Sequence, residues 1–156
     1  MRALVVIDMQ EKYLDEYDDG LLKSINRKIR MAHEEEDVSI VYVKNVGLTG
    51  SRAGYELSTD LLLVSDLVYE KDEPSAFSSK AFTDKIKCLK ATELELVGVD
   101  GSSCIAKTAL DAIKRGYKTK IVKSCVGARD KKIYEKVLEE LEDAGVMVLS
   151  PGNQVQ

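Results

Sequence analysis

The chain has 156 residues, a net charge of −4 and no basic stripe, which argues against a nucleic-acid partner. Its apolar runs are far too short to cross a bilayer, so no membrane partner is expected either. Three cysteines, an odd number, do not form the pattern of a disulfide framework, and no leader precedes the first apolar run; we therefore expect a cytoplasmic protein with a single domain over residues 1–156.

Short runs of β-branched and aliphatic residues predict strands, and several are apolar throughout, as in strands covered on both faces. Apolar residues three and four apart predict helices between most of them. In chain order we expect a strand at 3–7, a helix at 22–32, strands at 38–43 and 67–69, a helix at 79–89, a strand at 94–97, a helix at 105–115, a strand at 119–122, a helix at 133–141 and a strand at 146–149. Gly116 and Gly145 stand where the last two helices need C-caps.

Strands that alternate with helices are typical of an α/β protein, here a three-layer α/β/α fold with a six-stranded parallel, Rossmann-like sheet. Residues 45–66 are the exception, because they contain Gly47, Gly50 and Gly54 and show no clean period. A connection this long in a compact domain is usually functional. We therefore expect this segment to help form a pocket.

Polar residues follow three of the predicted strands. Asp8 comes directly after the first strand, Lys71 after the third, and Cys104 ends the DGSSC turn after the fourth. In open α/β sheets, ligands bind beyond the carboxyl ends of the strands. The sequence thus predicts a carboxylate, an ammonium group and a thiol at one edge of the sheet.

Cys104 is either a small buried apolar residue, the usual fate of a free cysteine, or a nucleophile. The context favours the nucleophile. Ser102 or Ser103 can cap the following helix, which places Cys104 in the first turn, where unpaired N–H groups and the helix dipole favour a thiolate. The same amides can receive a developing oxyanion.

Asp8 and Lys71 also have two interpretations each. Asp8 could cap a helix that starts near Gln10, or act as a general base. Lys71 could be a solvated charge, or a partly buried cation beside the acid and the thiol. His33 is the single histidine and lies among acidic residues, so we expect neither a His-based metal site nor a Cys–His pair. The sequence has no glycine-rich dinucleotide or P-loop motif, and we expect no cofactor.

With these residues in hand, the sequence resembles the isochorismatase-like cysteine hydrolase superfamily. The resemblance rests on four blocks, which read ALVVIDMQEKY, GYELSTDLLLVSDLVYEKDEPSAF, LVGVDGSSCIAKTALDAIKRGYK and KIVKSCVGARD. Acid, lysine and cysteine occur in the family's order, and together the blocks extend over nearly the whole chain.

The resemblance implies a catalytic triad of Asp8, Lys71 and Cys104 that hydrolyses a C–N bond of a small amide or carbamoyl compound through a thioester. It also implies a non-proline cis peptide at Val99–Asp100, and an oxyanion site made by backbone groups near Ser103 and Cys104. Further implications are a homodimer or higher homo-oligomer and a pocket that includes three more side chains, those of Gln10, Tyr13 and Phe77. Nicotinamidase-like members hold a metal with Asp and His residues, but residues 45–66 contain no histidine, so no metal is expected.

One departure from the family pattern lies next to the nucleophile. Relatives often have Thr and an acidic residue in the three positions before the cysteine, where this chain has Gly101 and Ser102. Two rival functions therefore stay open: a catalytically silent α/β binding protein, and vinyl-ether hydrolysis of the isochorismatase type. Isochorismatases tend to lack the cysteine, so Cys104 favours C–N cleavage.

Overall fold

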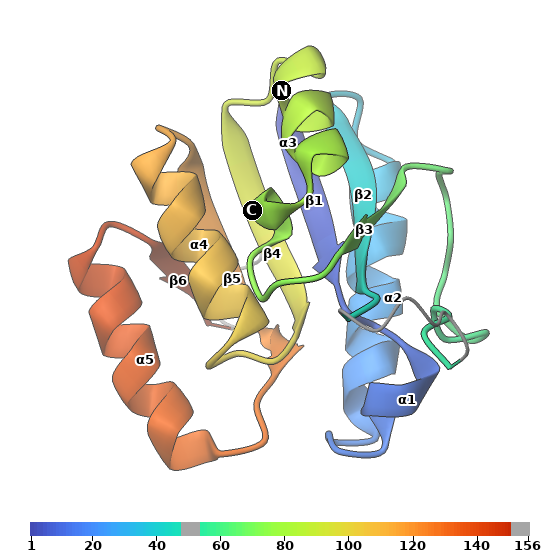
Figure 1. The fold of residues 1–156 in the computed structure, drawn as a ribbon, viewed down its shortest axis with the longest axis vertical. Coiled ribbons are helices and arrows are strands. Elements are labelled where there is room, and N and C mark those ends of the chain that lie inside the picture. Colours follow the sequence, from blue (N-terminus) through green and yellow to red (C-terminus); the bar gives the residue numbers. More distant parts are fainter. Residues whose placement is uncertain (48–53, 151–156) are drawn as a thin grey trace.

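The computed structural model describes residues 1–47 and 54–150. In this part of the chain six parallel strands form one sheet in the order β3-β2-β1-β4-β5-β6 (Figure 1). The strands are β1 (Arg2–Ile7), β2 (Val38–Asn45), β3 (Val68–Lys71), β4 (Glu93–Val99), β5 (Lys118–Gly127) and β6 (Met147–Leu149). The helices are α1 (Glu11–Leu14), α2 (Gly20–His33), α3 (Lys80–Cys88), α4 (Cys104–Lys114) and α5 (Lys131–Asp143), with a 3-10 turn, η1, at Ala76–Ser78.

This architecture confirms the predicted three-layer α/β/α fold. Helix α2 packs on one face of the sheet against β2 and β5, while α3, α4 and α5 cover the other face (Figure 1). The side chains of β1 alternate between the two layers: Val5 and Ile7 belong to the core under α3–α5, and Leu4 and Val6 to the core under α2. Because both faces of β1 are buried, its sequence is apolar throughout rather than alternating.

Strand β5 is longer than the predicted strand at 119–122, which its polar residues Lys123 and Ser124 had cut short. Leu96 of β4 pairs with Ile121, but Gly98 pairs with Val126, so the single residue of β4 between these pairs, Val97, lies opposite four residues of β5. This bulge carries β5 on to Gly127, beside the end of β4. The end of β5 therefore reaches the turn that holds Cys104.

The predicted helices are present, and two of them, α4 and α5, are followed by a glycine that ends the helix. Gly116 and Gly145 have φ values of +89° and +106°, as the predicted C-caps require. Helix α1 begins at Glu11 with Gln10 in the N-cap position, so the structure corrects the idea that Asp8 caps a helix. No helix among residues 1–47 and 54–150 is long and apolar enough to cross a membrane.

Residues 45–66 connect β2 to β3 and have little regular structure where they are described; residues 48–53, including Gly50, lie outside the described part. Leu57 and Leu61 pack into the core under α2.

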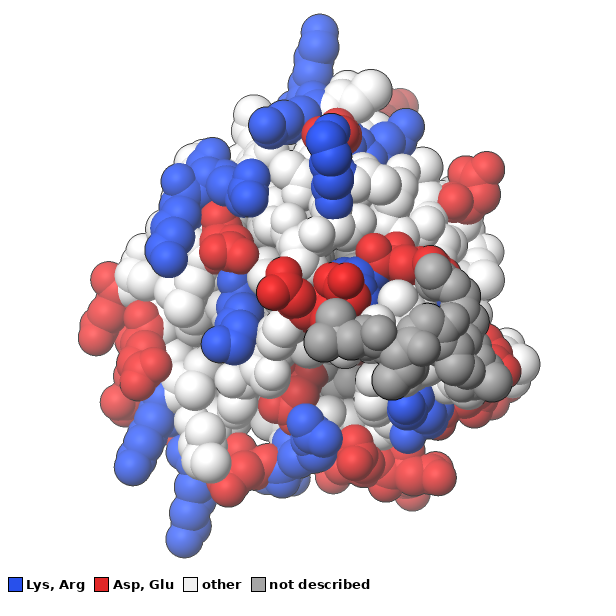
Figure 2. Space-filling view, viewed as in Figure 1, with Lys and Arg blue, Asp and Glu red and all other residues white. Residues whose placement is uncertain are grey.

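Basic and acidic side chains are interspersed over the face seen in Figure 2, without a patch of one sign. This agrees with the absence of a basic stripe in the sequence.

Candidate functional site

The side chains of Asp8, Lys71 and Cys104 meet at the carboxyl edge of the sheet. Lys71 Nζ lies 3.1 Å from Asp8 Oδ2 and 3.4 Å from Cys104 Sγ. A third contact, at 3.2 Å, joins Lys71 Nζ to the carbonyl oxygen of Glu73. The lysine thus uses its three N–H donors on an acid, a thiol and a backbone carbonyl.

The two charged members of this cluster are buried. The side chain of Lys71 is 0% exposed and that of Asp8 is 4% exposed. A buried lysine is costly unless an acid faces it at close range, and Asp8 meets that condition. The sheet brings this about, because Asn45 of β2 pairs with Lys71 while Val43 of β2 pairs with Ile7, the residue before Asp8.

The backbone of Asp8 turns sharply out of β1. Its φ of +55° lies in the left-handed region, which Asp tolerates better than most residues. Its Oδ2 accepts a hydrogen bond from Lys71 Nζ. Its Oδ1 is buried and accepts no hydrogen bond from the described residues. Burial raises the pKa of the Asp8 carboxyl above its usual range, and the Lys71 charge lowers it by a smaller amount. One oxygen of a rather basic carboxylate is therefore available to take a proton.

Cys104 is the first residue of α4, and its surroundings disfavour the thiolate. Burial raises the pKa of Cys104 to about 11, and the Asp8 charge adds to this effect, while Lys71 opposes it. The expectation that the helix start and the lysine favour a resting thiolate is therefore corrected. Desolvation and the facing Asp8 carboxylate raise the Cys104 pKa by more than the Lys71 ammonium group and the partial charge of the helix end lower it.

The turn before Cys104 is built around Asp100. The peptide bond Val99–Asp100 is cis, as the family resemblance implied. The Asp100 carbonyl accepts the N–H groups of Ser103 and Ile105, each at 3.1 Å, and Asp100 Oδ1 accepts the N–H of Ser102 at 2.9 Å. Contrary to the prediction, neither Ser102 nor Ser103 caps α4 with its side chain. The Ile105 N–H, at the start of the helix, donates to the Asp100 carbonyl instead.

The pattern leaves two amides of this turn unpaired among the described residues, those of Asp100 and Cys104. The Cys104 N–H finds no acceptor within the described residues, whereas the Ser103 N–H is engaged by Asp100. Gly101 has no space for a side chain, because an added Cβ would lie 2.6 Å from the ring of Tyr134. The space that a side chain at position 101 would need is thus filled by Tyr134 of α5.

A cavity of about 180 Å³ opens beside the cluster. Its lining comes from the ends of β1, β2 and β4, from the turn before α4, and from the segments that follow β1, β3 and β5. The lining residues are Asp8, Tyr13, Tyr17, Asn45, Pro74, Val99, Asp100, Ser103, Cys104 and Arg129.

Three residues of this lining were missed by the sequence analysis, namely Tyr17, Pro74 and Arg129, whereas Asn45 belongs to the segment 45–66 that was expected to help form a pocket. Arg129 does carry a signal, because it lies just after the carboxyl end of a strand. Tyr17 carries none, since it reaches the cavity from the loop before α2.

Two predicted pocket residues, Gln10 and Phe77, do not line this cavity, and that expectation is corrected. Gln10 is fully buried and binds backbone instead: its Nε2 donates to the carbonyls of Asn45 and Tyr55, and its Oε1 accepts the Asn45 N–H. It therefore anchors the segment that follows β2. Phe77 packs in the core and stacks on Tyr117, with ring centroids 6.0 Å apart.

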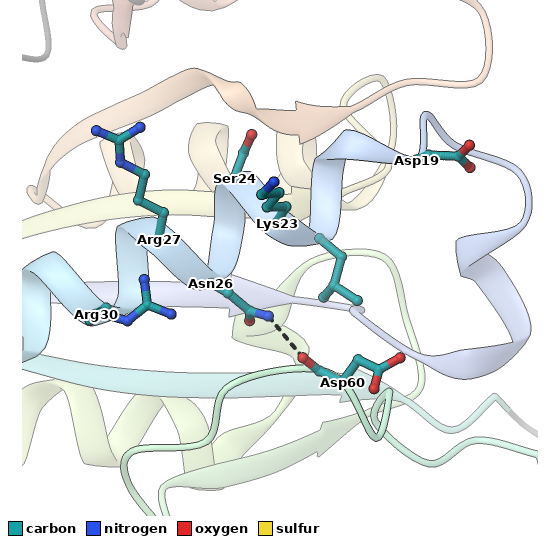
Figure 3. Close-up of a pocket in the computed structure, with 8 residues that line it drawn as sticks. Asp19, Lys23, Ser24, Asn26, Arg27, Arg30 and Asp60 are labelled. Carbon is teal, nitrogen blue, oxygen red and sulfur yellow. Dashed lines mark hydrogen bonds between the residues drawn. The ribbon is translucent and has the colours of Figure 1, made fainter.

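A larger groove of about 630 Å³ lies on the outer side of α2 (Figure 3). Its wall contains the exposed cations Lys23, Arg27 and Arg30, and Asn26 donates a hydrogen bond to the Asp60 carbonyl across it. The groove contains no thiol and none of the three clustered side chains. The smaller cavity, beside Cys104, therefore holds the groups that could carry out a reaction.

The described residues do not provide a metal site. They include no group of three or more His, Cys, Asp and Glu side chains placed to hold an ion. His33 is exposed near the far end of α2.

The comparisons with known proteins agree with the fold. Residues 2–151 match the family model described as Isochorismatase domain. A maleamate amidohydrolase from Pseudomonas putida is 29% identical over 77 residues, which cover 49% of this chain and 36% of that protein. The match thus spans little more than a third of that relative.

Two solved structures have similar folds. An isochorismatase-like hydrolase from Alkaliphilus metalliredigens has a TM-score of 0.81 at 17% identity, over 96% of this chain and 94% of that one. A pyrazinamidase of Pyrococcus horikoshii, in complex with zinc, has a TM-score of 0.75 at 19% identity, over 96% and 98%. At such identities these likenesses show the fold alone.

Proposed function

Because the chain belongs to the isochorismatase family, we propose that it is a hydrolase that uses Cys104 to cleave the C–N bond of a small amide or carbamoyl compound. The observation that carries this proposal is the cluster itself. Lys71 lies between an acid with one unpaired oxygen and a thiol, at 3.1 and 3.4 Å. A nucleophile beside a base that is itself held in place is the arrangement that acyl transfer needs.

In the first step, Cys104 Sγ attacks the substrate carbonyl while Asp8 Oδ1 takes the thiol proton. The raised pKa of the thiol means that the thiolate forms during the attack rather than before it. The raised pKa of Asp8 makes it a better base than an exposed carboxylate, because its basicity is closer to that of the groups it must deprotonate. The Lys71 ammonium stabilises the carboxylate before the transfer and the sulfur as it gains negative charge.

The oxyanion of the tetrahedral intermediate would be received by the Cys104 N–H, which is unpaired among the described residues. The Ser103 N–H, predicted as a second donor, is engaged by the Asp100 carbonyl and would have to leave it. The Asp100 N–H, next to the cis bond, has no acceptor in the described part and is the better second donor. One such donor typically contributes about 3 kcal/mol of barrier lowering.

Collapse of this intermediate breaks the C–N bond. Asp8 returns its proton to the departing nitrogen, ammonia or an amine leaves, and Cys104 holds the acyl group as a thioester. Asp8 then takes a proton from a water molecule as the water oxygen attacks the thioester, and Asp8 gives this proton to the departing Cys104 sulfur, which releases the acid and restores the thiol. Atoms and charges balance with water as the only co-reactant, and no step requires a metal.

The cavity of about 180 Å³ suits a small substrate. The names of the similar proteins suggest two amide types to test: monoamides of dicarboxylic acids, as for the maleamate amidohydrolase, and pyrazinamide, as for the pyrazinamidase. Both are small amides that would release ammonia.

The test is an ammonia-release screen over small amides and carbamoyl compounds, with isochorismate alongside. We expect one amide to be turned over, Cys104→Ala to lose about 10⁴-fold or more in kcat, and intact-protein mass spectrometry to show a covalent acyl adduct. Cys88→Ser is the matched control, since Cys88 is an exposed thiol at the end of α3. An active Cys104→Ala enzyme, or turnover of isochorismate alone, would overturn the proposal, and no turnover with any compound would favour the silent binding protein.

A further inference from the structure

Asp100 binds three separate parts of the chain through one carboxylate. Its Oδ1 accepts the N–H of Ser102, in its own turn, at 2.9 Å. Its Oδ2 accepts the backbone N–H of Arg129, after β5, at 2.9 Å and the hydroxyl of Tyr17, before α2, at 3.1 Å. Arg129 Nε adds an ion pair at 3.5 Å.

The carboxylate is nearly buried, with a side chain 9% exposed, so it is stable only because these donors surround it. A carboxylate with two backbone donors, a hydroxyl and a guanidinium in fixed directions has little freedom to move. Tyr17 and Arg129 also form part of the wall of the cavity beside Cys104. Asp100 therefore joins that wall to the turn before α4.

The same residue controls the amides that lead into the nucleophile. Its side chain and its carbonyl together accept the N–H groups of Ser102, Ser103 and Ile105, on both sides of Cys104, and leave the Cys104 N–H unpaired. Gly101 and Ser102 supply no acid to this turn. The carboxylate that braces it comes instead from Asp100, directly after the cis bond.

We propose that Asp100 is the positioning residue of the active site: its carboxylate fixes the turn so that the Cys104 thiol stays within reach of Lys71 and Asp8. This inference rests on the proposed function, because positioning matters only if Cys104 is the nucleophile. Asp100 touches no reacting atom through its side chain; it acts through the backbone of the turn and through the two wall residues that it binds.

Asp100→Asn is the direct test, since the amide keeps the shape but its nitrogen cannot accept a hydrogen bond. In the variant, one of the two positions that hold a carboxylate oxygen no longer accepts hydrogen bonds from the donors that face it, and the turn loosens. A displacement of about 1 Å at a nucleophile can cost about 100-fold, so we expect kcat to fall by about that factor. Tyr17→Phe removes only one donor, should fold normally, and should cost about tenfold.

A second measurement needs no substrate: the rate of Cys104 alkylation by iodoacetamide as a function of pH, read by peptide mass spectrometry. In the native enzyme the midpoint should lie at about pH 11. When the turn is released from Asp100, the thiol gains contact with water, and the midpoint should move down toward the ordinary cysteine value of about 8.5. Two controls should leave the profile unchanged: Ile29→Ala, which lowers stability in the core under α2, and Glu16→Gln, which removes the other acid bound by Arg129.

The inference is overturned if Asp100→Asn and Tyr17→Phe both keep the native kcat and alkylation profile, or if Ile29→Ala shifts the profile as much as Asp100→Asn. The second result would assign Asp100 a merely structural role. The alkylation readout also separates the two proposals. A shifted profile in an enzyme that turns over no amide would support positioning and refute the function, whereas an unshifted profile beside an inactive Cys104→Ala enzyme would do the reverse.

Discussion

Replacing Lys71 with methionine tests the buried cluster without any assumption about substrate. Methionine keeps the length of the side chain but leaves the Asp8 carboxylate, 4% exposed, without its cation. Removing one partner of a buried ion pair typically costs about 3–5 kcal/mol. The Glu73 carbonyl also loses its 3.2 Å contact, so we expect a loss near the middle of that range, about 4 kcal/mol, at pH 8.

The cost should depend on pH in a defined direction. Burial already raises the pKa of Asp8 in the native chain, and without Lys71 nothing of comparable size opposes it. The folded variant then binds the Asp8 proton more tightly than the folded parent does, so its stability relative to the parent protein falls as pH rises above the Asp8 pKa of the folded parent, which itself lies above the ordinary carboxyl value of 3.8. The deficit should therefore be smaller near about pH 4–5 than at pH 8.

Urea unfolding followed by circular dichroism at pH 5 and pH 8 measures both quantities. Asp8→Asn and the double variant complete a mutant cycle, in which the double variant should be more stable than the sum of the single losses by about 2 kcal/mol or more. Lys80→Met is the control, because Lys80 pairs with Asp84 on an exposed helix face and should change nothing measurable. Additive losses in the cycle, or a Lys71→Met protein as stable as the parent at pH 8, would refute the reasoning.

Two further predictions follow from single contacts. Alkylation of Cys104 in the unmodified enzyme should still be accelerating at pH 10, because burial and Asp8 raise the thiol pKa to about 11; a plateau below pH 8 would contradict this. Gly98→Ala should destabilise by about 3 kcal/mol or more or prevent folding, since its φ is +122° and an added Cβ would lie 2.0 Å from the Ile7 carbonyl. Gly116→Ala shares a positive φ but meets no atom within 4 Å, so thermal unfolding should show a loss of only about 1–2 kcal/mol; equal losses in the two variants would remove the steric argument.

Local pattern was enough to determine the layers and the positions of the three clustered residues. Apolar runs marked strands buried on both faces, and helical spacing marked the elements between them. Since parallel strands end at one edge, Asp8, Lys71 and Cys104 could be assigned to that edge from their places after strands. The long β5 could not be predicted, because its bulge depends on pairing with β4 rather than on its own composition.

Tertiary structure decided what the individual side chains do. The state of the Cys104 thiol depends on burial and on its distance from Asp8, and neither follows from spacing along the chain. Gln10 was predicted in the pocket yet anchors a loop, because its partners are backbone groups 35 and 45 residues away. Arg129 likewise meets Asp100 only through the fold. Sequence periodicity reports which face of an element is buried, but desolvation and hydrogen bonding act through space, so only the assembled chain determines them.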